Sequence, residues 1–254
     1  MNILLVDAGN TRVKWALADT LATPGQWLEH EHGAVLHADL ATLPWRTLGT
    51  QRGAACALVS NVAGSALRAE LAALLSPLPV TWFASRPALA GIANGYREPA
   101  QLGSDRFAAA IGARALAPGR ALVVATCGTA TTIDAIDADG RFTGGMILPG
   151  LALMAASLAN NTAQLPPVTP RVSLPSMFAD NTMDAILSGC INAQAGAIER
   201  AVAAHRADDC IISGGAAGHI APALTIAHSV RETLVLTGLH AAAAAMAQQG
   251  ELSC

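Results

Sequence analysis

The pattern of apolar and polar residues predicts alternating strands and helices along most of the chain. Near the amino end, the apolar run of residues 3–6 predicts a buried strand, and the pair Gly9-Asn10 predicts a tight turn. Apolar and polar residues then alternate over residues 12–17, which predicts a second strand that returns beside the first. The first fifteen residues are therefore expected to form a β-hairpin.

The same criteria place further elements along the chain. Strands are predicted at residues 56–62, 80–83, 121–127, 130–136, 141–148 and 210–213, and helices at residues 64–75, 107–116, 151–161 and 182–205. Residues 234–240 are interpreted as a last strand or turn before a terminal helix. Strands that alternate with helices are typical of an α/β protein.

Composition narrows the class of protein. Apolar residues make up 52% of the 254 positions and charged residues 13%, so the chain can form a substantial core in one large domain or two ordinary ones. The formal net charge of −3, with no basic run, argues against nucleic-acid binding. No uninterrupted apolar stretch reaches membrane-spanning length, and the amino end resembles no signal peptide. A cytoplasmic protein is expected.

The histidines and the cysteines give little support for a metal site or for disulfide bonds. Histidines 30, 32 and 37 lie in a weakly patterned segment, residues 19–50, which is better explained as a solvated loop or an edge hairpin. The five cysteines lack paired spacing and predict neither a zinc site nor a disulfide framework. They are interpreted as small apolar residues in a reducing cytosol: Cys56, Cys127, Cys190, Cys210 and Cys254.

The tip of the first hairpin carries groups suited to a phosphate. A glycine at position 9 allows backbone amides to approach an anion, and Thr11 can donate to a phosphate oxygen. Lys14, the only lysine, can offset phosphate charge, and Asp7 can hold a hydrated magnesium ion. Taken alone, the stretch is explained as well by an ordinary turn with a solvated charged face.

A second stretch repeats the pattern of the first. Residues 121–136 contain an apolar run, the pair Gly128-Thr129 and a returning strand. The repeat suggests two related domains, residues 1–118 and residues 119–254, that face each other across a cleft and hold a phosphate chain from both sides.

A polar stretch that is interrupted by glycine and proline, residues 94–106, precedes the helix predicted at residues 107–116. Ser104 or Asp105 can cap that helix. Asp105 and Arg106 are explained either as a cap with a surface charge or as a base with a carboxylate clamp. Tyr96, the only tyrosine, is a candidate pocket wall.

Six motifs, taken together, resemble type III pantothenate kinases in order and spacing over nearly the whole chain. They are Asp7-Ala-Gly-Asn-Thr11, Gly103-Ser-Asp-Arg106, Gly128-Thr-Ala-Thr-Thr132, Gly144-Gly-Met-Ile-Leu-Pro-Gly150, Asn181-Thr182 and Ser213-Gly-Gly215. The resemblance implies an α/β fold of two ribonuclease-H-like domains with a central cleft, as in the superfamily of actin, sugar kinases and heat-shock-chaperone ATPases. It also implies ATP-dependent phosphorylation of pantothenate, the first step towards coenzyme A. Members are usually cytoplasmic homodimers that need a divalent metal such as Mg²⁺ and often a monovalent cation.

The resemblance also implies roles for individual residues. ATP would be bound by Thr129 and by the first loop: Asp7, Ala8, Gly9, Asn10, Thr11, Arg12, Val13 and Lys14. Pantothenate would be held by Tyr96, Gly103, Ser104, Asp105 and Arg106, and by Thr182, which would come from the partner subunit. Asp105 matches the family's proton acceptor, and the planar fork of Arg106 suits the substrate carboxylate.

One position departs from the family pattern. Thr126 stands where many members have the aspartate that binds potassium. A hydroxyl lacks the charge of a carboxylate, so a weak or absent requirement for K⁺ or NH₄⁺ is expected. Two alternatives to a pantothenate kinase remain: a kinase for another small hydroxy compound, and a non-catalytic nucleotide-binding regulator of transcription.

Overall fold

The computed structural model describes residues 1–28, 31–45, 47, 53–171, 173–252 and 254, which form two compact units. The first contains Met1–Pro118, Gly140–Phe142 and Thr233–Cys254, and the second contains Gly119–Asp139 and Thr143–Glu232. The chain first passes between the units after Pro118, at the boundary predicted between residues 118 and 119. Of the three histidines considered as ligands, His30 lies outside the described residues.

The first unit is built on a five-stranded sheet in the order β3-β2-β1-β4-β5. Its strands are β1 (Asn2–Ala8), β2 (Arg12–Asp19), β3 (His32–Leu36), β4 (Cys56–Asn61) and β5 (Val80–Phe83). β2 pairs antiparallel with β1 and with β3, whereas β4 is parallel to β1 and β5 is parallel to β4. The predicted hairpin is confirmed, and β3 is the edge strand within the weakly patterned segment.

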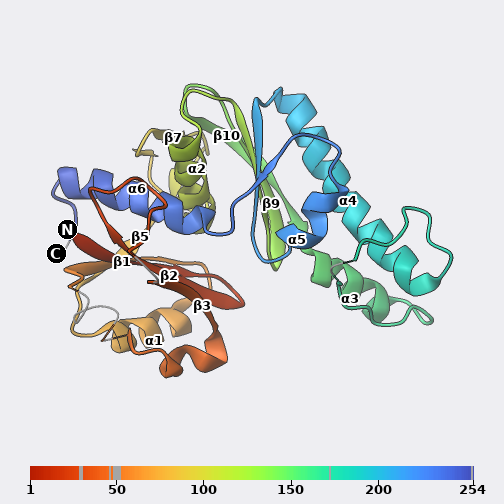
Figure 1. Cartoon of the computed structure of the whole chain (residues 1–254), viewed down its shortest axis with the longest axis horizontal. Coiled ribbons are helices and arrows are strands. Elements are labelled where there is room, and N and C mark those ends of the chain that lie inside the picture. The colour runs from red at the N-terminus through yellow and green to blue at the C-terminus, as the bar shows by residue number, and fades with distance from the viewer. Residues whose placement is uncertain (29–30, 46, 48–52, 172, 253) are drawn as a thin grey trace. The chain divides into compact units, whose positions relative to one another are not determined.

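Helices cover both faces of this sheet (Figure 1). α1 (Ser65–Leu75) packs its buried leucines against the face that carries Leu4, Val6 and Val59. α2 (Ser104–Leu116) and α6 (Leu234–Gln248) lie on the other face, where they contact β1 and β4. Because side chains alternate along a strand, Asp7 points towards the face covered by α2 and α6.

The interpretation of residues 234–240 as a strand or turn is wrong, because these residues begin α6. The run is apolar on every side, a pattern that does not distinguish a short buried strand from a buried helix. α6 packs tightly on α2, where a Cβ at Gly238 would collide with the carbonyl oxygen of Ala108. The predicted second domain extended to residue 254, whereas Thr233–Cys254 lie in the first unit.

The second unit repeats the strand arrangement of the first. Its strands follow the order β10-β9-β8-β11-β12, with bounds β8 (Leu122–Cys127), β9 (Ala130–Ile136), β10 (Arg141–Pro149), β11 (Asp209–Ser213) and β12 (Ser229–Val230). β9 is antiparallel to β8, β11 is parallel to β8, and β12 is parallel to β11. β8, β9, β11 and β12 therefore correspond to β1, β2, β4 and β5, and the predicted internal repeat is confirmed.

The first two residues of β10, Arg141 and Phe142, belong to the first unit. They pair there with the short strand β7 (Ile92–Asn94), which runs antiparallel to β6 (Ala88–Leu89).

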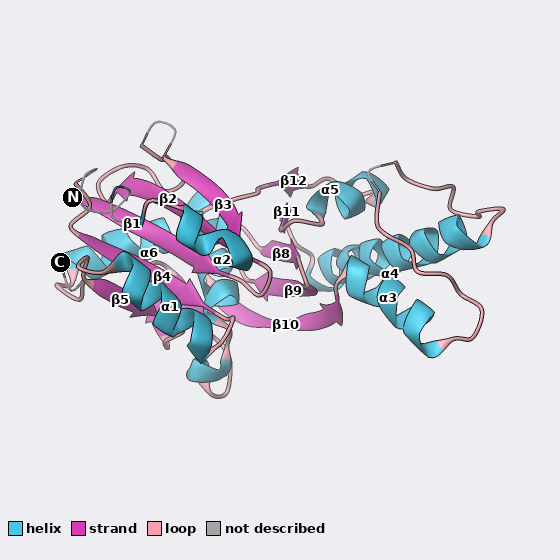
Figure 2. Cartoon of the chain, turned by 90° about the horizontal axis from the view of Figure 1, so that it is seen from below, coloured by secondary structure: helices cyan, strands magenta, loops and turns pink. Residues whose placement is uncertain are grey.

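Helices complete the second unit. α3 (Leu151–Asn161) lies beside the long α4 (Thr182–His205), and α5 (Ala217–Ile220) follows β11 (Figure 2). The predicted start of α4 is confirmed, because the side chain of Asn181 accepts a hydrogen bond from the amide of Asp184 at 3.0 Å. Short 3-10 turns occupy η1 (His37–Thr42), η3 (Pro99–Gln101) and η4 (Ala221–Ala223). Across the described part of the chain, every helix is too short or too polar to cross a membrane.

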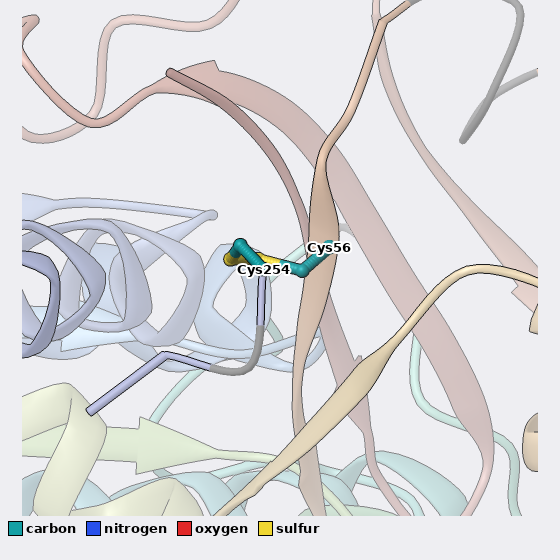
Figure 3. The surroundings of a disulfide bond; sticks show 2 residues. All are labelled: Cys56 and Cys254. Carbon is teal, nitrogen blue, oxygen red and sulfur yellow. A yellow bond between two sulfur atoms is a disulfide. The ribbon is translucent and has the colours of Figure 1, made fainter. Parts of the chain in front are cut away.

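The expectation that all five cysteines are unpaired is wrong. Cys56, at the start of β4, forms a disulfide with Cys254, the last residue of the tail that follows α6 (Figure 3). The partners are 198 residues apart in sequence, so spacing rules could not connect them. Cys127, Cys190 and Cys210 are free and buried, as expected of small apolar residues.

Cleavage of the disulfide is expected to lower the thermal stability of the protein. A cross-link that closes a long loop restricts the unfolded chain, and its loss typically costs about 2–5 kcal/mol. The variant Cys254→Ser should therefore melt at a lower temperature than the oxidised wild type in differential scanning calorimetry. Dithiothreitol should bring the wild type to the melting temperature of the variant and leave the variant unchanged. An equal response of both proteins to the reductant would contradict this assignment.

Candidate active site in two half-sites

The first half-site begins at the turn between β1 and β2. Gly9, Asn10 and Thr11 form this turn, which is closed by a hydrogen bond from the amide of Gly9 to the carbonyl of Arg12 at 3.2 Å. Asn10 and Thr11 are exposed. Backbone amides and hydroxyl groups at such a turn can donate hydrogen bonds to an anion.

Three polar residues on neighbouring strands face the same side of the sheet below this turn. Asp7 of β1 is opposite Lys14 of β2 and Ser60 of β4 in the strand register. Ser60 is fully buried, whereas Asp7 and Lys14 are half-buried. Residues paired across a sheet project to the same face, which here is the face covered by α2.

The electrostatic environment of Asp7 is unusual for a carboxyl group. Burial raises the pKa of Asp7 to about 7, and the charge of Asp105 contributes in the same direction, while Lys14 opposes both. Burial also raises the pKa of Asp105, against a hydrogen bond from the amide of Arg106. The first unit therefore contains two carboxyl groups with raised pKa values, and the charge of one, Asp105, raises the pKa of the other, Asp7.

A divalent cation fits this environment. Magnesium is usually bound through one or two carboxylates, substrate phosphates and water, and it would favour the charged form of Asp7. Among the described residues, no three His, Cys, Asp or Glu side chains form a metal cage. The residues present therefore suit a cation that arrives with a phosphate ligand.

Asp105 is placed by the start of α2. The N-cap position is taken by Gly103, without a side-chain cap, so the expectation that Ser104 or Asp105 caps the helix is wrong. Asp105 lies in the first turn, and its Oδ1 accepts a hydrogen bond from the amide of Arg106 at 2.8 Å. A Cβ at Gly103 would come within 2.7 Å of that oxygen, so the glycine leaves room for the carboxyl group. The raised pKa makes Asp105 a better proton acceptor near neutral pH than an ordinary aspartate.

Arg106 and Tyr96 meet beside Asp105. The Nη1 atom of Arg106 donates a hydrogen bond to the hydroxyl of Tyr96 at 2.7 Å. The guanidinium group also lies 5.6 Å from the centre of the Tyr96 ring and 5.7 Å from that of Phe142. Two of the residues that the resemblance assigned to the substrate thus lie side by side, and Phe142 is a neighbour that the sequence analysis did not identify.

The second half-site is the turn between β8 and β9, in the second unit. Gly128 and Thr129 are exposed there, and the amide of Gly128 donates to the carbonyl of Ala130 at 2.9 Å. The carbonyl of Thr129 accepts a hydrogen bond from the amide of Gly150 at 3.0 Å, and a Cβ at Gly150 would collide with the turn. The motif that ends at Gly150 therefore supports this turn.

Gln194 of α4 connects the helix to the strands behind the second turn. It is fully buried; its Oε1 accepts a hydrogen bond from Thr131 at 2.8 Å, and its Nε2 donates to the carbonyl of Pro149 at 3.0 Å. Sequence analysis did not identify Gln194, because a single glutamine in a helix of small residues has no distinctive spacing.

Two further candidate residues also lie in the second unit. Thr126 is half-buried near the end of β8 and is paired in register with Thr132. The Oγ1 of Thr132 is buried without a hydrogen-bond partner among the described residues. Thr182 is the exposed first residue of α4. Thr126, Thr129 and Thr182 are thus placed in a different unit from Asp7 and Asp105.

His37 supports the first turn, which sequence analysis did not foresee. Its Nε2 lies 2.8 Å from the carbonyl oxygen of Gly9. A carbonyl only accepts, so Nε2 must carry the hydrogen. The histidine was assigned to a solvated segment, and only the pairing of β3 with β2 brings it to the turn.

Comparisons with known proteins agree on the family and the fold. The profile of the family described as type III pantothenate kinase matches residues 3–204. A type III pantothenate kinase from Herminiimonas arsenicoxydans is 56% identical over 256 residues, which cover 95% of this chain and 97% of that protein.

Two solved structures share the fold at low sequence identity. A Campylobacter jejuni protein assigned to the Baf family of transcriptional activators has a TM-score of 0.63 at 20% identity, covering 98% of this chain and 100% of that chain. A ROK hexokinase from Thermus thermophilus has a TM-score of 0.51 at 13% identity, covering 99% and 100%. At these identities the likenesses concern the fold alone, and they confirm the predicted α/β class shared with sugar kinases.

The pKa of Asp7 is expected to respond in opposite directions to two substitutions. Lys14→Met removes a positive charge that favours the carboxylate, so it should raise the pKa above about 7. Asp105→Asn removes a like charge and should lower it. Carbon-13 NMR titration of the Asp7 carboxyl carbon measures both shifts in the absence of ligands. Shifts of the same sign in the two variants would contradict the opposite effects of Lys14 and Asp105 on the pKa of Asp7.

Proposed function

Because the chain belongs to the type III pantothenate kinase family, we propose that it transfers the γ-phosphate of ATP to the primary hydroxyl group of pantothenate. The product is 4'-phosphopantothenate, and the reaction is the first step of coenzyme A biosynthesis. The observation that carries the proposal is the placement of Asp105 at the start of α2, beside Arg106 and in electrostatic interaction with Asp7.

We propose that the two turns described above contribute to ATP binding. The first turn would supply the backbone amides and side chains of residues 7–14, with Lys14 offsetting phosphate charge. The second would supply Thr129. In both turns the exposed residues lie between paired strands, so the donors are held in place before the ligand arrives. A bound Mg²⁺ supplies charge neutralisation at the phosphates, and Asp7 is the residue that would hold it through water.

Pantothenate would be held at the start of α2. Its carboxylate suits Arg106, whose guanidinium is oriented by Tyr96. Gly103 and Ser104 would contact the substrate beside Asp105, and Thr182 would contribute from a partner subunit.

Asp105 is the proposed proton acceptor. An alcohol is a poor nucleophile, and a carboxylate within hydrogen-bond reach can orient it and take its proton late in the reaction. Positioning and charge neutralisation should provide most of the remaining rate enhancement.

We also propose a cytoplasmic homodimer. Large apolar side chains are exposed near the start of α4, with Phe178 at 90%, Met177 at 66% and Met183 at 52% of their surface. A groove beside them is lined by Ala185, Gly189 and other residues of α4. A second copy of the chain would cover this apolar surface, and Thr182 immediately precedes the exposed Met183.

Substitution of Asp105 by asparagine is expected to lower kcat by roughly 10²–10⁴-fold, because the amide cannot take a proton. An ADP-release assay with ATP and pantothenate measures the rate, and the exposed Asp39→Asn in the same unit is the matched control. Similar rates for wild type and Asp105→Asn would remove Asp105 from the mechanism.

The same assay distinguishes a pantothenate kinase from a kinase for another hydroxy compound and from a non-catalytic regulator. Turnover with a sugar or another carboxylic acid in place of pantothenate would favour a kinase for a different hydroxy compound. A protein that binds ATP without turnover would instead favour a regulatory role.

The wild-type enzyme is expected to work without K⁺ or NH₄⁺, because Thr126 has no negative charge to bind the cation. Thr126→Asp should make the rate depend on potassium, while Thr126→Ser should behave like the wild type. Rates are compared in KCl and in choline chloride at equal ionic strength. Negligible wild-type activity in choline, with a steep rise on adding potassium, would refute the inference from Thr126.

A further inference from the structure

A buried serine outside the predicted site connects the central sheet to the start of α2. The Oγ of Ser60, on β4, lies 2.8 Å from the Oγ of Ser104. Ser60 is fully buried, and Ser104 immediately precedes Asp105. A second hydrogen bond near the start of α2 is longer: the Oγ of Ser85 donates to the carbonyl of the N-cap residue Gly103 at 3.4 Å.

The strand register places the Ser60–Ser104 contact beside Asp7. Ser60 is the partner of Asp7 in the parallel pairing of β1 with β4. The backbone ladder therefore fixes Ser60 relative to Asp7, and the hydroxyl pair fixes Ser104 relative to Ser60. Together these links connect the two carboxyl-bearing elements of the first unit, β1 and α2.

We propose that Ser60 is a positioning residue that holds Asp105 through Ser104. The inference rests on the proposed function, in which Asp105 accepts the proton of the substrate hydroxyl. The start of α2 has no side-chain N-cap. The Ser60–Ser104 contact therefore restrains a helix end that lacks the hydrogen bond of a capping side chain. A residue that only supports folding would not alter kcat selectively.

Other contacts hold the body of α2, so loss of the serine contact should leave the helix folded. Phe107 stacks on Phe83 with ring centres 6.0 Å apart, and α6 packs closely against α2. The expected change is therefore confined to the first turn. A displacement of about 1 Å near the reacting atoms can cost about 10²-fold in rate.

The variant Ser60→Ala is expected to lower kcat roughly 10- to 100-fold, with the KM values for ATP and pantothenate changed by less than about twofold. Ser104→Ala should produce a similar loss in kcat, because it removes the other half of the same contact. The double variant should be no slower than the slower single variant, since the interaction can be lost only once.

The control is Thr237→Val, which removes another buried hydroxyl from the same unit. Thr237 is 4% exposed and donates to the carbonyl of Thr233 within α6 at 3.1 Å. This variant should lower the melting temperature but leave kcat unchanged.

Three results would overturn the proposal: a kcat of Ser60→Ala within about twofold of the wild type, a change confined to KM, or additive losses in the double variant. If Ser60→Ala does not fold, unchanged kcat in Ser104→Ala alone would overturn it. A wild-type protein that does not phosphorylate pantothenate would instead refute the proposed function, so the two failures are distinguishable.

Discussion

The parallel pairing of β1 with β4 is the constraint on which the first half-site depends. It fixes Asp7 beside Ser60 and, with the antiparallel partner β2, beside Lys14, all on one face of the sheet. A shift of one residue in either strand would turn these side chains to the α1 face, among leucines and valines. Such a shift is unfavourable because it would bury the charged groups of Asp7 and Lys14 among apolar side chains. Apolar burial thus determines where the charged groups lie.

The two units share a strand order but support their turns differently. The first turn is followed by a strand that carries charge, and a histidine side chain donates to its Gly9 carbonyl. The second turn is held by backbone contacts from Gly150 and by Gln194, which connects β9 and β10 to α4. Asp7, a carboxyl group whose pKa is raised, therefore lies beside the first turn, while the exposed residues of the second turn are Gly128 and Thr129.

Much of this arrangement could be predicted from the sequence because its signals are local. The hairpins, α1, α4 and the polar segment before α2 follow from short-range periodicity, turn residues and caps. The features that were missed depend on long-range contacts. Ser60 and His37 reach the site only through strand pairing, Cys56 meets a residue 198 positions away, and residues 234–240 form a helix because α2 covers them. A local pattern contains no information on such partners.

The return of the chain's end to the first unit has a consequence for folding. α6 packs on α2, and the tail beyond α6 is bonded to Cys56 on the same strand as Ser60. Cys56, Leu58 and Ser60 alternate with the residues that face α1, so they all point towards the face covered by α2 and α6. This face of the sheet is therefore fully covered only when residues 233–254 have docked. Contacts of such wide sequence separation form slowly, because the entropy of closing a long loop is lost before the contact stabilises the fold. The first half-site should accordingly become ordered late in folding, after the second unit, which is contributed by residues 119–232 apart from residues 140–142.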